Sequence, residues 1–390
     1  MRAKLANTDN SPCTQAFPLV DLKAQYRALK PEIDAAIERV MDSQHFILGP
    51  EVESLEREVA EYCSSQFAVA CASGSDALLL ALMALQVGPG DEVVTTPFTF
   101  VATAGAIARL GARPVFIDID QRTYNIDPTK LPSAITSKTR AIIPVHLYGM
   151  AADMAAILEI ADGRSVPVVE DAAQAIGATY AGRPVGSFGR CGCFSFFPSK
   201  NLGGAGDGGM LTTNDEKLAD RLRVLHLHGG RTKYEYEEIG INSRLDALQA
   251  AILRVKLRHL DSWAAGRKLK AERYAELFEE RGLTQVVRLP EVAAQCTHVY
   301  NQYVIRAPRR DELKAFFDER GVPSAIYYPL PLHLQRAFAY LGYQRGDLPQ
   351  SEAASQETLA LPIFPEMTKE QQNLVVDLTA EFYADGNPRC

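Results

Sequence analysis

The stretch FAVACASGSDALLLAL, Phe67 to Leu82, joins a short apolar run to a longer one through a turn of small residues. The first run has the length of a strand, and the second has the length and composition of a helix. Further strands are expected at EVVTT (92–96), RPVFID (113–118), AIIPVH (141–146) and VPVVED (166–171). Helical stretches separate these runs, and that alternation is typical of right-handed βαβ units around a mostly parallel sheet.

The sheet is expected to continue at CFSFF (193–197) and GGMLTTN (208–214). From about Glu216 long helical patterns replace the alternation, and a smaller α+β segment follows. A chain of 390 residues also exceeds the size of most single cores. We therefore predict a large α/β domain over 1–265, which opens with a helical segment, and a small C-terminal α+β domain over 266–390.

Composition and charge limit the possible functions. The net charge of −7 and the lack of a basic run argue against a nucleic-acid partner. No apolar run approaches the ~20 residues that a membrane span requires, and the first 17 residues lack the apolar core of a secretory signal. The seven cysteines show neither metal-ligand nor disulfide spacing. We expect a cytoplasmic protein without a membrane partner.

A lysine and an acid at the ends of two strands indicate the chemistry. Lys200 lies in SFFPSKNLGG (195–204), 29 positions after Asp171 in VVEDAAQA. Pyridoxal phosphate (PLP) needs a lysine that forms an imine and an anion that keeps its pyridine nitrogen protonated. A lysine beside apolar residues has a lowered pKa, so it can act as nucleophile and then as base. The pair predicts a PLP site, and ligands of open α/β sheets lie beyond the carboxyl ends of the strands.

The turn after the first strand could hold the phosphate of that cofactor. The backbone N–H groups of Gly74 and Ser75 open the following helix, and a helix N-terminus attracts anions. The alternative is an ordinary N-cap made by Ser73 or Ser75. Ser195 precedes the lysine in its aromatic strand, and its hydroxyl could reach the same phosphate.

Other strand ends offer groups for the cofactor ring. In PFTFVAT, Phe100 is the candidate for stacking on a pyridine ring, and Phe98 is expected in the core. Glu170 and Asp171 are neighbours on a strand, so they point to opposite faces and only one can meet the ring. Gln174 could hydrogen-bond a ring substituent if the chain turns after the strand.

Asn242, Ser243 and Arg244 precede an amphipathic helical pattern in GINSRLDALQAAIL (240–253). These polar residues could cap the helix or belong to a binding site, and the pattern alone leaves both readings open. His226 and His228 lack a matching carboxylate or cysteine cluster, so no metal site is expected.

The chain resembles the DegT/DnrJ/EryC1/StrS family of PLP-dependent nucleotide-sugar aminotransferases, a branch of the aspartate-aminotransferase-like fold (fold type I). The resemblance runs from about Pro18 to the C-terminus. It rests on a set of motifs: FILGPEV, SGSDAL, PFTFVAT, YNIDP, EDAAQA, SFFPSKNLGG, GINSRLDALQAAIL and YYPLPLHLQ. It implies a mostly parallel central sheet with a smaller C-terminal domain.

The resemblance also implies a role for each candidate residue. Lys200 is the lysine that carries the cofactor, Asp171 pairs with the pyridinium nitrogen, and Gln174 contacts the 3-hydroxyl. The remaining cofactor contacts are Gly74, Ser75 and Ser195 at the phosphate and Phe100 on the ring. Asn242 would reach the cofactor phosphate of the neighbouring subunit, which makes a homodimer with shared sites necessary for catalysis.

Within the family, two motifs are most similar to enzymes that aminate the 3-keto form of UDP-N-acetylglucosaminuronic acid. In those enzymes an arginine that matches Arg244 and a His–Tyr pair contact the sugar acid. This chain has Tyr327 and Tyr328 in place of that pair, so a phenol replaces a possible cation. Arg244 remains, and a guanidinium suits a carboxylate.

The resemblance therefore implies transfer of an amino group from an amino acid such as L-glutamate to a nucleotide-linked ketosugar. UDP-2-acetamido-2-deoxy-3-keto-glucuronate is the first acceptor, and a dTDP-3-keto-6-deoxyhexose or a cyclitol ketone is the alternative. Dehydratases of the family have histidine at the position of Lys200, which counts against that reaction. A non-catalytic PLP-binding regulator is disfavoured by the intact set Asp171, Gln174 and Lys200.

Overall fold

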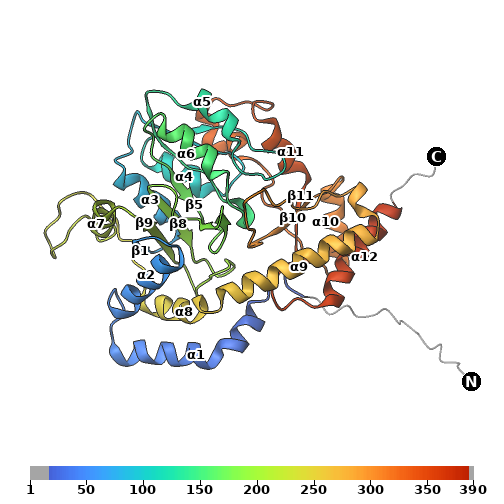
Figure 1. The fold of residues 1–390 in the computed structure, drawn as a ribbon, viewed down its shortest axis with the longest axis horizontal. Coiled ribbons are helices and arrows are strands. Elements are labelled where there is room, and N and C mark those ends of the chain that lie inside the picture. The colour runs from blue at the N-terminus through green and yellow to red at the C-terminus, as the bar shows by residue number, and fades with distance from the viewer. Residues whose placement is uncertain (1–16, 386–390) are drawn as a thin grey trace, which may run out of the picture.

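The computed structural model describes residues 17–385, which form a twisted central sheet covered by helices on both faces and a smaller C-terminal part (Figure 1). Four strands of the sheet lie in the order β1 (Phe67–Cys71), β9 (Gly209–Thr213), β8 (Cys191–Ser195) and β5 (Val169–Asp171). Three more lie in the order β4 (Thr139–Ile142), β2 (Glu92–Thr95) and β3 (Arg113–Phe116). Parallel bridges from Ile142 to Val168 and from Val145 to Asp171 join the two groups.

The predicted α/β fold of type I with a mostly parallel sheet is confirmed. The one antiparallel strand of this sheet is β9, which pairs with both β1 and β8. A glycine-rich turn rather than a crossover helix connects β8 to β9, so the chain can reverse direction there. The strand expected over 141–146 is regular only to Ile142, because Pro144 interrupts it before the bridge to Asp171.

Side chains on successive positions of β1 enter two different cores, as the two-residue period of a strand requires. Val69 and Cys71 pack with α3 (Gly74–Ala84), α4 (Val101–Arg109) and α7 (Glu216–Leu225). Ala68 and Ala70 pack on the other face with α1 (Leu22–Ser43), α2 (Pro50–Tyr62) and α8 (Ala247–Leu257). Both faces of the sheet are therefore covered, and its strand ends are left to form a site.

Farther along the sheet, α5 (Leu131–Ala134) and α6 (Met154–Asp162) supply a third cluster of buried side chains. A short hairpin of β6 (Thr179–Tyr180) and β7 (Arg183–Pro184) follows β5. The helices and strands that follow α8 are α9 (Leu260–Glu280), β10 (Tyr303–Arg306), α10 (Arg310–Glu319), α11 (Pro349–Glu357), β11 (Thr358–Leu361) and α12 (Lys369–Asp385).

The long helix α9 runs from the large part of the molecule to the small one (Figure 1). Its first turns, at Trp263 and Ala264, pack against the core of α1, α2 and α8. From Ala271 onward its buried side chains join a separate core with β10, β11, α10 and α12. We therefore propose the domain boundary at residues 265–266, as the sequence suggested. The strand expected over 299–307 is shorter, because only β10 pairs with β11.

Part of the C-terminal segment packs on the large domain instead. Leu332, Phe338 and Leu348 lie in one cluster with Phe116 of β3. The carboxylate of Asp118, just after β3, accepts hydrogen bonds from the backbone N–H groups of Gln350 (2.8 Å) and Ser351 (2.9 Å) at the start of α11. These contacts fix the preceding segment, which contains Tyr327 and Tyr328, against the end of the sheet.

Among residues 17–385, no helix is long and apolar enough to cross a membrane. The expectation that the first 17 residues hold no secretory signal concerns a segment that lies, except for Phe17, outside the described residues.

Candidate active site

A cavity of about 690 Å³ lies beyond the carboxyl ends of the central strands, between the sheet and the C-terminal part. It includes nine of the eleven residues expected at the site: Gly74, Ser75, Phe100, Asp171, Gln174, Ser195, Lys200, Tyr327 and Tyr328. Asn242 and Arg244 do not line it. The location agrees with the general place of ligands in open α/β sheets.

Asp171 is the last residue of β5, and its carboxylate is only 5% exposed. One carboxylate oxygen accepts a 2.7 Å hydrogen bond from the Thr103 hydroxyl, and the other accepts a 3.2 Å bond from the Ala173 N–H. Burial raises the pKa of Asp171, and these two bonds together with Lys200 oppose that shift. The carboxylate is thus fixed in place but poorly compensated, so a cation in the cavity would be bound strongly.

Glu170 points to the opposite face of the sheet and is fully buried. Its carboxylate accepts backbone hydrogen bonds of 2.7–2.8 Å from Gly186, Phe188 and Gly189, and it lies 3.1 Å from Nε2 of His146. All of these partners are structural. Of the two neighbouring acids, Asp171 is the one that lines the cavity.

Lys200 lies in the turn that follows β8, where its backbone N–H donates to the Phe197 carbonyl at 2.9 Å. Burial lowers the pKa of Lys200 to about 8, and the negative charge of Asp171 acts in the opposite direction. Near neutral pH a usable fraction of the amine is therefore uncharged, which a nucleophile or a base requires.

The side-chain amide of Gln174 has a fixed orientation. Its oxygen accepts a 2.7 Å hydrogen bond from the Tyr148 N–H, and its nitrogen donates to the Tyr328 hydroxyl at 3.1 Å. The chain turns after β5 as expected, so Gln174 lines the cavity. Its donor end and the Tyr328 hydroxyl are the groups that a ring oxygen would meet.

The small-residue turn after β1 lies at one end of the cavity. It contains an ordinary helix cap and also leaves backbone N–H groups free for an anion. The Ser73 hydroxyl caps α3 by accepting a 3.1 Å bond from the Asp76 N–H. The N–H groups of Gly74 and Ser75 open the helix and have no partner within it. A Cβ on Gly74 would lie 2.6 Å from Cβ of Ser195, so only glycine allows the turn and Ser195 to meet at this point.

Phe100 is 56% exposed and its ring centre lies 6.4 Å from that of Tyr328, so one face of the ring is available to a ligand. Phe98 is fully buried, as predicted from its place in the same strand end. Tyr327 and Tyr328 come from the C-terminal part and pack beside Phe98 and Tyr148. An aromatic wall thus faces the strand ends across the cavity.

The segment before α8 bears on the two readings that the sequence left open. Asp246 is the N-cap residue, and its side chain makes no capping bond. Ser243 accepts from the Ala72 N–H (3.1 Å) and donates to the Asp76 carboxylate (2.8 Å) at the start of α3. The reading of Asn242, Ser243 and Arg244 as a helix cap is therefore wrong, because α8 begins three residues later.

Sequence reasoning missed Thr103, which holds the carboxylate of Asp171, and Tyr148, which orients Gln174. Thr103 lies one turn after Phe100 in PFTFVAT, so its place in the first turn after a strand was the available signal. Tyr148 carries no comparable signal, because it contacts Gln174 through its backbone.

These residues fit pyridoxal phosphate. The cavity offers a lysine with a lowered pKa for the covalent link, a buried carboxylate for the ring nitrogen, free helix N–H groups for the phosphate, and an exposed aromatic face for the ring.

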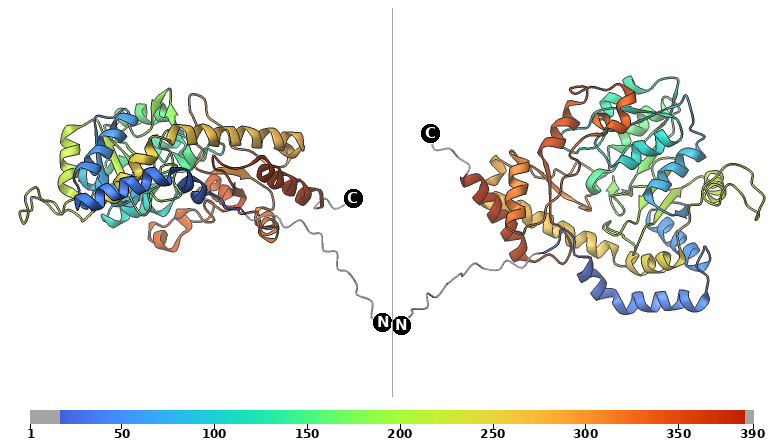
Figure 2. Two further views of the ribbon diagram at one scale, coloured as in Figure 1. Left: turned by 90° about the horizontal axis from the view of Figure 1, so that it is seen from below. Right: turned by 180° about the vertical axis from the view of Figure 1, so that it is seen from behind.

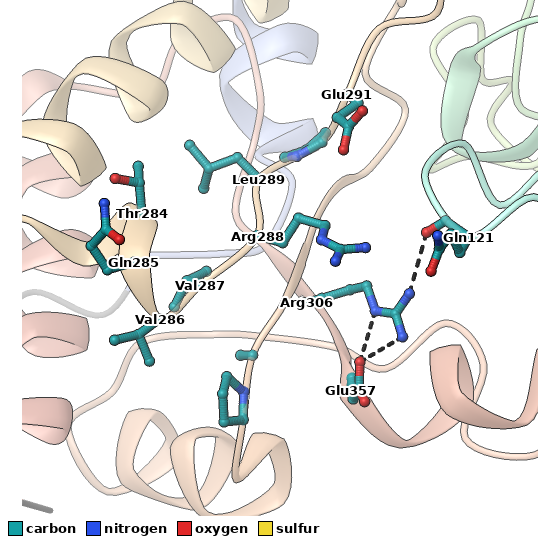
Figure 3. A pocket seen from close by; sticks show the side chains of 13 residues that line it. Gln121, Thr284, Gln285, Val286, Val287, Arg288, Leu289, Glu291, Arg306 and Glu357 are labelled. Carbon is teal, nitrogen blue, oxygen red and sulfur yellow. Dashed lines mark hydrogen bonds and ion pairs between the residues drawn. The ribbon is translucent and has the colours of Figure 1, made fainter. Parts of the chain in front are cut away.

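A second cavity, of about 810 Å³, lies between the small domain and the loop at Gln121 (Figure 3). Its Arg306 guanidinium is already paired with Glu357 at 2.6 Å and donates to the Gln121 carbonyl at 3.2 Å. Arg288 and Glu291 at the wall are exposed. Since its lining contains neither a lysine nor a buried acid, this cavity does not offer the chemistry of the first.

Comparison with known proteins agrees with the site. A sequence profile of the DegT/DnrJ/EryC1/StrS aminotransferase family matches residues 27–379. A pleiotropic regulatory protein of Geobacillus stearothermophilus is 54% identical over 94% of this chain and 98% of its own. A UDP-N-acetyl-3-dehydro-alpha-D-glucosamine 3-aminotransferase of Acidithiobacillus ferrooxidans is 47% identical over 91% of this chain and 95% of its own.

A dTDP-3-amino-3,4,6-trideoxy-alpha-D-glucose transaminase of Streptomyces venezuelae is 45% identical over 95% of this chain and 97% of its own. The crystal structure of DesV from S. venezuelae, in complex with a ketimine intermediate, superposes with a TM-score of 0.91. That pair is 44% identical and covers 95% of this chain and 99% of DesV.

Proposed function

Because this chain belongs to the DegT/DnrJ/EryC1/StrS aminotransferase family and is a PLP-dependent sugar aminotransferase, we propose that it moves an amino group from L-glutamate to a nucleotide-linked 3-ketosugar. The observation that carries this proposal is the cavity that unites Lys200, Asp171 and Gln174. The product would serve the synthesis of cell-surface polysaccharide or a modified sugar. We place the reaction in the cytoplasm, on the scattered cysteines of the sequence.

When bound, the cofactor supplies an electron sink for the carbanion that forms as a proton leaves carbon. Lys200 would hold the cofactor covalently, and its amine, once free, would accept and return the proton of the substrate carbon. Asp171 would keep the ring nitrogen protonated. Gln174 would orient the ring through the 3-hydroxyl, and Phe100 would cover one ring face. Gly74, Ser75 and Ser195 would hold the phosphate.

We propose UDP-2-acetamido-2-deoxy-3-keto-glucuronate as one acceptor and a dTDP-3-keto-6-deoxyhexose as the other, with equal standing. Arg244 lies outside the cavity of its own subunit, so it would favour the acid only through the shared site proposed below, where a guanidinium could form paired hydrogen bonds with a carboxylate. Tyr327 lines the cavity where a cation could otherwise meet the acid, which favours the neutral sugar. The names of the Acidithiobacillus and Streptomyces relatives likewise cover UDP- and dTDP-linked sugars.

Single-turnover amination by the pyridoxamine form of the enzyme separates the two acceptors. If Arg244 binds a carboxylate, the uronate reacts faster, and Arg244→Lys loses roughly tenfold or more of the preference for acid over neutral sugar, since lysine cannot form the paired bonds. Faster amination of the 6-deoxy sugar by the unaltered enzyme overturns the uronate proposal and leaves the aminotransferase itself untouched.

We also propose a homodimer whose two sites are shared. Asn242 is exposed, although its neighbour Ser243 is bound to the start of α3. The segment between α7 and α8 projects from the body of the molecule (Figure 2) and carries Tyr234 (77% exposed) and Ile239 (88% exposed). Exposed apolar groups on a projecting segment favour contact with a partner subunit.

Mixing two inactive variants tests the shared site. Lys200→Ala and Asn242→Ala should each be inactive alone, and subunit exchange should restore activity because each mixed dimer regains one intact site. Exchange is followed with differently tagged subunits. A mixed dimer that forms and stays inactive contradicts the proposal, and a mixture of Lys200→Ala with Asp171→Asn, whose residues share one subunit's cavity, is the negative control.

A regulatory role without catalysis is the alternative that the name of the Geobacillus relative brings forward. The fixed geometry of Asp171 and the lowered pKa of Lys200 favour catalysis, since a protein that only binds PLP has no need of a tuned base. Single-turnover amination decides between the two.

A further inference from the structure

The turn that bears Lys200 leads into two glycines, Gly203 and Gly204, whose backbone is contacted by helix α8. A Cβ on Gly203 would lie 2.2 Å from the Pro198 carbonyl oxygen, so the chain folds back on itself within five residues. The Gly204 N–H closes this loop with a 2.8 Å bond to the Phe196 carbonyl. Leu202 anchors the turn in the core and Asn201 donates to the Val299 carbonyl at 3.0 Å, but Gly203 and Gly204 after them carry no side chain. The position of this descending arm therefore depends on bonds that neighbouring elements make to its backbone.

Two side chains of α8 supply those contacts. Oε1 of Gln249 accepts a 2.8 Å hydrogen bond from the Ala205 N–H, and Nζ of Lys256 donates to the Gly203 carbonyl. Gln249 and Lys256 are seven residues apart, which places them on one face of the helix two turns apart. The two bonds thus hold the descending arm of the Lys200 turn at both a donor and an acceptor.

Lys256 is an unusual residue for its place. It is 7% exposed, and within residues 17–385 it has no ion pair with a carboxylate. It lies beside apolar side chains of α1, among them Leu29 and Ile33, and burial lowers its pKa to about 8. An apolar side chain would cost less free energy to bury at this position. The hydrogen bond from Lys256 to the Gly203 carbonyl is therefore the contact that explains a lysine here.

We propose that Gln249 and Lys256 are positioning residues, which hold the turn so that the Lys200 amine keeps its place in the cavity and meets the carbonyl carbon of PLP in one orientation. Neither residue lines the cavity. Their effect reaches the chemistry through the backbone of Gly203 and Ala205. This inference concerns attachment of the cofactor and is independent of which ketosugar is aminated.

The test follows attachment of PLP to full-length enzyme that has been freed of cofactor. The Lys200 nitrogen forms a double bond to the aldehyde carbon, water leaves, and a visible absorption band appears. The rate is measured against pH, because only the neutral amine attacks. In Lys256→Met and Gln249→Met we expect water to reach the amine, the pH midpoint to rise by about one unit, and attachment at pH 7, below both midpoints, to slow by about tenfold.

The charged and titratable groups that share the cavity with Lys200 are Asp171, Asp207, Tyr327 and Tyr328, and they are unchanged in every variant. Gln249→Glu keeps an acceptor for the Ala205 N–H and should restore most of the rate. Arg254→Met is the matched control on the same helix: Arg254 pairs with Glu51 and Glu58 of α2. It should lower the melting temperature and leave the pH midpoint unchanged.

An unshifted midpoint in Gln249→Met and Lys256→Met overturns the proposal, and so does an equal shift in Arg254→Met, which would reveal general loosening. If Lys256→Met does not fold, Gln249→Met with its Gln249→Glu partner decides alone. Borohydride reduction followed by mass spectrometry gives a second readout: the fraction of label on Lys200 should fall in the two loosened variants at limiting PLP.

Discussion

Lys200→Ala is expected to lose the covalent link to PLP and to lower turnover by roughly 10⁴-fold, the upper range for loss of a general acid–base group. The loss is this large because one side chain serves both as the nucleophile and as the proton carrier. The lowered pKa of Lys200 and its place in the cavity with Asp171 give the physical reason. The visible band of the enzyme-bound cofactor and the rate of the glutamate half-reaction are the measurements.

Borohydride reduction of the unaltered enzyme should place the cofactor on Lys200. Lys217 on the exposed start of α7 is the matched control, and Lys217→Ala should behave as wild type. Recovery of the reduced label on Lys256, the other buried lysine near this turn, would mean that the wrong lysine has been assigned.

The second large effect concerns the ring nitrogen. Asp171→Asn keeps the shape of the side chain but removes the negative charge that stabilises the protonated ring, so turnover should fall by roughly 10²- to 10³-fold. The phosphate and stacking contacts remain, so cofactor occupancy should change far less. Occupancy is read from the absorbance of released PLP, and turnover from single-turnover rates.

Glu170→Gln is the matched comparison, because it alters the neighbouring acid on the other face of β5. Glu170 holds the backbone of Gly186, Phe188 and Gly189, so its loss should reduce the melting temperature more than the rate per folded site. If Glu170→Gln is inactive while Asp171→Asn is nearly normal, the carboxylate of the ring nitrogen has been misassigned.

The pH dependence gives an independent view of Asp171. Burial raises the pKa of this acid, so in the enzyme without cofactor it takes up a proton at a higher pH than an ordinary aspartate. The protonated form cannot stabilise a cationic ring. Binding of PLP should therefore weaken as the pH falls through that raised pKa, and Asp171→Asn should remove this acid limb.

Much of the fold follows from periodicity. The apolar runs at 67–72 and 92–96 are short and bounded by turns, so strands and helices are located within a few residues. Sheet order does not follow, because β1 and β9 are far apart in sequence and pair through backbone hydrogen bonds that any apolar run could make. The antiparallel direction of β9 depends on the glycine turn and has no side-chain signal.

Some residues of the candidate site can likewise be predicted from the sequence, and others cannot. Lys200 and Asp171 are readable because their chemistry demands these residue types at strand ends. The role of Ser243 could not be predicted, because polar residues before a helix resemble a cap. Its hydroxyl instead accepts a hydrogen bond from the Ala72 N–H and donates one to the Asp76 carboxylate, in another part of the chain. Long-range contacts of this kind depend on packing that no local pattern specifies. The Gln249 and Lys256 contacts belong to this class too.

The pairing of β1 with β9 also has a consequence for synthesis on the ribosome. In the sheet order β1 has β9 as its neighbour, and β9 is made only after Gly209 has been added. At roughly 5–20 residues per second, β1 lacks this partner for about 7 to 28 seconds. Lys200 is made just before β9, so the nascent chain can first bind the cofactor at about the time when β9 pairs with β1 and completes the sheet.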